Sequence, residues 1–108
     1  MFLFFDTETT GLPRSWQAPV SDLNNWPRMV QLAFLAYDKA GNRLAQEDFI
    51  IRPDGYIIPP DASAIHGISQ ARALAGGSAL SDVLARFSQY LERAEGLIAH
   101  NKIGRAHV

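Results

Sequence analysis

The feature that most constrains this chain of 108 residues is an apolar run at its start that stops at two carboxylates. The run Phe2–Phe5 is followed by Asp6 and, two positions later, by Glu8. Successive side chains of an extended strand point to opposite faces, so Asp6 and Glu8 should share one face at the mouth of a sheet. Two such carboxylates repel each other unless a cation neutralises them, and Mg²⁺ or Mn²⁺ is the usual solution. The pair alone is more often a plain solvated strand end, and metal-dependent phosphoryl chemistry is the hypothesis that the rest of the motif has to support.

Composition limits the class of protein. A chain of this length holds at most one small domain, and its 47% apolar and 19% charged residues are typical of a globular one. The net charge of −1 argues against a basic coat, so nucleic acid would be held locally. The absence of cysteine excludes thiolate chemistry and fits a cytoplasmic protein. The apolar start is too short for a signal peptide or a membrane span, and no membrane partner is expected.

Apolar patterning predicts an α/β order of elements. Strands are expected at residues 2–5, 29–37, 43–52 and 97–99, with a hairpin turn at 38–42. A short helix should begin at Pro59-Pro60-Asp61 and stop at Gly67, and a second should run from Ser69 to Gly76-Gly77. An amphipathic helix from Ser78 should then pack on the sheet through apolar residues at three- and four-residue spacing: Leu80, Val83, Leu84, Phe87 and Leu91.

The last predicted strand brings a second polar segment to the carboxylates. A strand–helix–strand crossover normally returns parallel, so residues 97–99 should lie beside the first strand. Ligand sites of open α/β sheets form beyond the carboxyl ends of strands. We therefore expect His100 and Asn101 near Asp6 and Glu8.

Residues 13–28 form a long loop without regular periodicity, and this loop contains both tryptophans of the chain. Trp16 and Trp26 either fold the loop onto the body of the protein or offer a surface on which bases stack. The sequence leaves both interpretations open.

Residues 6–12, DTETTGL, resemble the first motif of the DEDD 3′–5′ exonucleases, the family of the DNA polymerase III proofreading subunit and ribonuclease T. The hairpin at 29–52 resembles the family's antiparallel pair, IHGI at 65–68 its substrate-proximal turn, and LIAHN at 97–101 the start of its second motif. The resemblance implies a ribonuclease H-like mixed sheet with flanking helices, incomplete at the C-terminus, with strand order 3-2-1-4.

The resemblance also implies an activity, hydrolysis of phosphodiester bonds at the 3′ ends of single-stranded DNA or RNA. Two Mg²⁺ or Mn²⁺ ions roughly 3.5–4 Å apart would activate water and stabilise the leaving oxygen. Asp6 would bridge both ions and Glu8 would hold one. A DNA polymerase is a further expected partner.

On the substrate side, the resemblance implies positions for six residues: Thr7, Thr9, Gly11, Leu12, His66 and Asn101. Gly11 would let the backbone approach the terminal nucleotide, and Leu12 would wedge against its base. The plainer alternatives are an ordinary turn glycine at Gly11, a polar helix cap at His66 and a strand-end cap at Asn101.

The sequence departs from the family pattern after Asn101. The family expects a metal-binding aspartate four positions further, where this chain has Arg105, and its later histidine and aspartate find no match here. The alternative function is a noncatalytic nucleic-acid-binding or interaction domain with a degenerate exonuclease fold.

The ending resembles a translated sequencing adapter. Residues 103–108, IGRAHV, can be encoded by ATC GGA AGA GCA CAC GTC. We therefore expect residues 1–101 to be the N-terminal portion of an exonuclease domain and residues 102–108 to be a non-native tail; a genuine divergent tail is the alternative. Such a portion would be inactive alone and would leave one face of its sheet wet, which predicts poor solubility.

Overall fold

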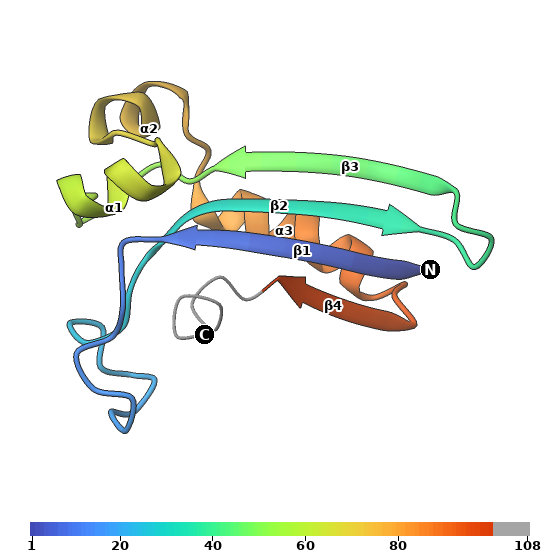
Figure 1. Cartoon of the computed structure of the whole chain (residues 1–108), viewed down its shortest axis with the longest axis horizontal. Helices are drawn as coiled ribbons and strands as arrows, with labels where there is room; N and C mark the ends of the chain where they lie inside the picture. Colours follow the sequence, from blue (N-terminus) through green and yellow to red (C-terminus); the bar gives the residue numbers. More distant parts are fainter. Residues whose placement is uncertain (101–108) are drawn as a thin grey trace.

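A computed structural model describes residues 1–100, with His100 described by its backbone alone. Asn101, Arg105 and the expected boundary between residues 101 and 102 lie outside the described residues. The elements in chain order are β1 (Phe2–Thr9), β2 (Met29–Tyr37), β3 (Arg43–Ile50), α1 (Pro60–His66), α2 (Gln70–Gly76), α3 (Leu80–Leu91) and β4 (Gly96–His100) (Figure 1).

The strands form one mixed sheet in the predicted order, β3-β2-β1-β4. The pairs β1–β2 and β2–β3 are antiparallel, whereas β4 lies parallel to β1. The expected α/β class and strand order are therefore confirmed. Within residues 1–100, no helix is long and apolar enough to cross a membrane.

One face of the sheet carries the main core, because α3 packs against it (Figure 1). In β2, the alternate residues Val30, Leu32, Phe34 and Ala36 are all buried. The ring of Phe34 lies 5.0 Å from that of Tyr90, measured between centroids. This alternation means that one face of β2 is fully covered while the other is only half-buried.

The predicted buried stripe of α3 is partly wrong. Leu80, Leu84 and Leu91 are 42%, 44% and 41% exposed, whereas Val83 and Tyr90 are buried. The helix turns the Val83–Tyr90 side to the sheet, because the rings of Phe34 and Tyr90 pack there. The spacing of apolar residues cannot distinguish this side of the helix from the adjacent side that carries the leucines. It also overlooked Tyr90, an aromatic residue with a polar hydroxyl.

The third strand ends at Ile50, two residues earlier than predicted. Ile51 still donates its N–H to the carbonyl of Val30 in β2 at 2.8 Å, and it forms an isolated parallel bridge with Ser78. The N–H of Arg52 donates to the carbonyl of Ser78 at 2.9 Å. The chain after β3 is thus tied to the segment that joins α2 to α3.

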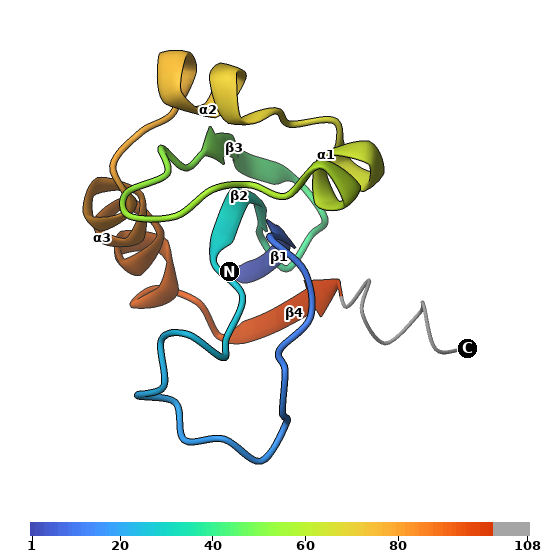
Figure 2. The same cartoon turned by 90° about the vertical axis from the view of Figure 1, so that its left-hand side faces the viewer.

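The two short helices begin and end close to the predicted positions. The first helix ends at His66 with Gly67 as its C-cap, and the Ser69 side chain caps the second by accepting from the N–H of Arg72 at 3.1 Å. Pro59 occupies the N-cap of α1 and makes no side-chain hydrogen bond there. Both helices enclose a second small core at the end of the sheet where β1 and β3 terminate (Figures 1 and 2): Val30, Ile58, Ala62, Ile68 and Ala73.

Candidate active site at the end of strand β1

The two carboxylates lie inside β1, which continues to Thr9 and is therefore longer than predicted. Asp6 and Glu8 are both half-buried. Leu3 and Phe5 belong to the core on the α3 side, so alternation puts Asp6 and Glu8 on the opposite face. The structure thus has both carboxylates on one face of the strand, about 7 Å apart along the backbone.

Strand pairing locates this face at the carboxyl edge of the parallel pair. Asp6 pairs with His100 of β4, and Glu8 lies two residues further along β1. The β1–β2 register shifts between Glu8 and Thr9, where β2 contains one extra residue. Such bulges recur next to active sites because they redirect side chains. The carboxylates of Asp6 and Glu8 therefore lie at the edge of the sheet where β1 and β4 end.

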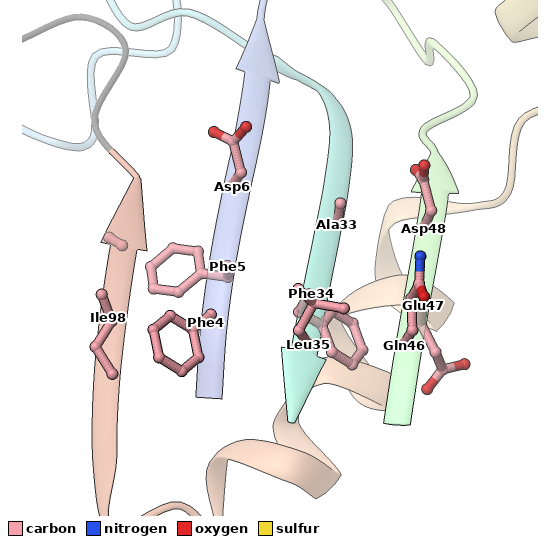
Figure 3. A pocket seen from close by; sticks show the side chains of 11 residues that line it. Phe4, Phe5, Asp6, Ala33, Phe34, Leu35, Gln46, Glu47, Asp48 and Ile98 are labelled. Atoms are coloured by element: carbon pink, nitrogen blue, oxygen red, sulfur yellow. The ribbon is translucent and has the colours of Figure 1, made fainter. Parts of the chain in front are cut away.

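A hollow of about 400 Å³ opens on the same face, beside Asp6 (Figure 3). Its lining comes from all four strands and combines an apolar part with polar groups at the sides: Phe4, Phe5, Asp6, Ala33, Phe34, Leu35, Gln46, Glu47, Asp48, Ile98 and Ala99. Asp6 lies nearer the arrowhead of β1 than Phe4 does (Figure 3). Phe4 and Ile98 are 41% and 42% exposed, so the hollow is open.

The polar side of the hollow is ordered by a hydrogen bond between neighbouring strands. The amide Nε2 of Gln31 donates to Oδ1 of Asp48 at 2.7 Å. Gln31 stands opposite Glu8 in the β1–β2 register. An amide fixed in this way lies between the acidic end of β1 and the acidic end of β3.

The donor chemistry at Asp6 and Glu8 suits a hard divalent cation. Both offer carboxylate oxygens, the ligands that Mg²⁺ and Mn²⁺ prefer. Within residues 1–100, no group of three or more His, Cys, Asp or Glu side chains could hold a metal ion. Mg²⁺ keeps several waters and is commonly bound by one or two carboxylates plus substrate phosphate, so a pair of carboxylates fits it.

The turn after Glu8 is held by a threonine. Oγ1 of Thr9 donates to the carbonyl of Gly11 at 3.0 Å. Gly11 has a φ of 145°, and a Cβ there would meet no atom within 4 Å. Leu12 is 56% exposed, and Thr7 occupies the opposite face of β1 from the two carboxylates. The structure thus brings Gly11 and Leu12 directly after the acidic pair, while their contacts with substrate stay predictions.

His66 is the last residue of α1, on the side of the molecule toward which β1 points (Figures 1 and 2). Its Nδ1 accepts from the N–H of Ile68 at 3.1 Å, which is the polar-cap arrangement. Nε2 therefore carries the proton of the neutral ring, and it is buried without a hydrogen-bond partner among residues 1–100. The role of His66 toward substrate stays a prediction.

Sequence reasoning missed the residues that hold the long loop. Thr10 and Arg28 clamp its two ends, because each backbone N–H of the pair donates to the other residue at 2.9 Å. Asn25 is buried and bonds both the N–H and the carbonyl of Ser15, at 2.7 and 2.9 Å. A threonine and an asparagine in a polar segment give no signal that separates such clamps from solvated loop residues.

Comparisons with known proteins agree with this fold and identify the family. Residues 3–104 match the family model RNase_T, described as exonuclease. The DNA polymerase III subunit epsilon-like protein of Rhodobacter capsulatus is 37% identical over 102 residues, which cover 93% of this chain and 13% of that protein.

Two solved structures of E. coli exonuclease I resemble the fold. The complex with a 5cy-dA13 oligonucleotide has a TM-score of 0.72 at 28% identity and covers 94% of this chain and 21% of that one. The complex with a dT13 oligonucleotide has a TM-score of 0.71 at 28% identity, covering 94% and 20%. The fold is thus the ribonuclease H-like mixed sheet of exonuclease I, and the chain spans only 13% to 21% of the length of these relatives.

Proposed function

This chain belongs to the DEDD 3′–5′ exonuclease family, and from that membership we propose that the protein carrying it is a metal-dependent 3′–5′ exonuclease. Its substrate is the 3′ end of a single strand, and its product is a nucleoside 5′-monophosphate. The observation that carries the proposal is the shared face of Asp6 and Glu8 where β1 and β4 run out. The matching exonuclease I structures hold oligodeoxynucleotides, which supports DNA as the substrate.

In the proposed reaction, water attacks the terminal phosphorus and the 3′-oxygen of the preceding nucleotide leaves. Asp6 and Glu8 would hold the divalent ions. When bound, these ions would lower the pKa of water and neutralise charge on the phosphate oxygens. The two carboxylates would keep the ions at one edge of the sheet, next to the open hollow.

The residues after Glu8 would position the terminal nucleotide. Gly11 has no side chain in a turn held by Thr9, so a sugar could approach the backbone closely. Leu12, exposed beside that turn, would pack against the terminal base. These contacts orient the scissile bond toward the acidic face, which is how an enzyme gains rate by alignment.

A second candidate function is a noncatalytic nucleic-acid-binding domain with this fold. One feature of the sequence favours it in the case where residues 102–108 are a genuine divergent tail: the arginine at position 105, where the family places an aspartate. The two candidates differ in a measurable way, because a binding domain would hold single-stranded DNA without shortening it.

The test is digestion of 5′-labelled single-stranded dT15 by the full-length protein with Mn²⁺. The wild type should produce a ladder of shortened products, and Asp6→Ala should reduce the rate at least about 100-fold. Asp82→Ala is the matched control, since Asp82 is exposed on α3 and should leave the rate unchanged. Equal rates for the wild type and Asp6→Ala would refute the assigned role, and binding without shortening would favour the second candidate.

A further inference from the structure

The loop between β1 and β2 presents one indole and anchors the other. Trp16 is 59% exposed, whereas Trp26 is half-buried. The two rings meet edge to face, with centroids 6.2 Å apart and planes at 74°. The indole N–H of Trp26 donates to the carbonyl of Pro19 at 2.8 Å. Trp26 therefore folds the loop onto itself, while Trp16 keeps most of its ring in solvent.

The exposed indole stands on a fixed support. Its neighbour Ser15 is bonded through both backbone groups to the buried side chain of Asn25. The ends of the loop are joined by the paired hydrogen bonds of Thr10 and Arg28. A large aromatic ring held in place loses little conformational entropy when a flat partner stacks on it.

The charge of the loop differs in sign from that of the chain. Residues 10–28 contain Arg14 and Arg28 and a single acid, Asp22, although the whole chain has a net charge of −1. Arg14 is exposed two positions before Trp16. Cationic groups beside an aromatic platform are the combination that single-stranded nucleic acids recognise, because phosphates meet the charge and bases meet the ring.

The loop also lies on the side of the molecule where β1 ends, next to Asp6 and Glu8. It begins directly after Thr9, at the carboxyl end of β1, and hangs below the sheet on the side where β1 and β4 point (Figures 1 and 2). A strand whose 3′ end reaches Asp6 could continue along this loop.

We propose that Trp16 is a stacking platform for a base of single-stranded DNA upstream of the 3′-terminal nucleotide, with Arg14 beside a flanking phosphate. This inference rests on the proposed function and extends it with a second substrate contact outside the catalytic edge. Trp16 is then a binding residue that acts on strands of several nucleotides and not on a single terminal one.

The test measures binding and single-nucleotide hydrolysis separately, on the full-length protein. Fluorescence anisotropy with labelled dT15 in EDTA, at fixed salt, gives the Kd without cleavage. Trp16→Ala should raise the Kd about 5- to 150-fold, the range expected for one lost stacked base. Trp16→Phe should retain most of the affinity. Val20→Ala is the matched control, because Val20 is 89% exposed in the same loop and has no ring.

Hydrolysis of the p-nitrophenyl ester of thymidine 5′-monophosphate with Mn²⁺ provides the second readout. Equal rates for the wild type and Trp16→Ala on this one-nucleotide ester, together with the weakened dT15 binding, support the inference. An unchanged Kd for Trp16→Ala, an equal loss in Val20→Ala, or an equal loss on the ester would overturn it while leaving the proposed exonuclease intact. A wild type that cleaves neither substrate would overturn the proposed function, and this inference with it.

Discussion

Replacing Gly77 by alanine tests how the α1–α2 pair is held on the sheet. Gly77 follows α2, where its N–H donates to the carbonyl of Ala73 at 2.9 Å. A Cβ at this position would lie 2.6 Å from the backbone nitrogen of Arg52 and 2.8 Å from its Cα, and it would also meet the carbonyl oxygen of Ala73. All three atoms belong to the backbone, so none can move away cheaply.

The neighbouring Gly76 is the matched control. A Cβ there would meet no atom within 4 Å, and Gly76 is the last residue of α2. Gly76→Ala should therefore be neutral or stabilise by up to about 1 kcal/mol, since alanine favours the helix. Gly77→Ala forces a methyl group into a packed contact, which typically costs about 1–3 kcal/mol. The two variants should differ by roughly 1–4 kcal/mol.

Native-state hydrogen exchange of the full-length protein, followed on peptides that cover α2, measures this difference locally. Each 1.4 kcal/mol lost from the opening free energy should accelerate exchange about tenfold. Gly77→Ala should therefore exchange faster than Gly76→Ala in α2 and in residues 51–58. Equal exchange in the two variants would show that the close approach of α2 to the chain after β3 does not hold the helices.

Three further outcomes follow from the described contacts. Phe34→Ala should destabilise the sheet by about 3–5 kcal/mol in denaturant unfolding, because the ring is buried between β2 and α3. Asn25→Ala should speed hydrogen exchange at Ser15, since both of its backbone hydrogen bonds are lost. Hydrogen bonds from Asn42 lower the pKa of Asp38 below its ordinary 3.8. Their stabilisation of the hairpin is therefore full above pH 3.8 and is lost as the pH falls through the lowered pKa. Carboxyl NMR titration of Asp38 checks this, and a pKa above 3.8 would contradict it.

Local chemistry predicted much of the fold. Period-two and continuous apolar runs located the strands, Gly67 and Ser69 marked the helix ends, and the parallel crossover gave the strand order. The errors came from contacts between distant segments. Ile51 pairs with Ser78 instead of extending β3, and the side of α3 that faces the sheet is decided by aromatic packing.

The same division holds for the candidate site. Alternation along β1 was enough to predict that Asp6 and Glu8 share a face, because that depends on the backbone of a single strand. The hydrogen bond between Gln31 and Asp48 could not be predicted, since it joins side chains 17 positions apart. Nor could the buried position of Asn25, which depends on how the loop closes on itself.

The central claim is that Asp6 and Glu8 hold divalent ions. Crystals of the full-length protein soaked in Mn²⁺ and measured at the manganese absorption edge test it directly, with Asp6→Asn crystals treated in the same way as the control. We predict anomalous density at coordinating distance from both carboxylates in the wild type and its loss or weakening in Asp6→Asn. Wild-type crystals that diffract well and show no anomalous density beside Asp6 and Glu8 would contradict the claim.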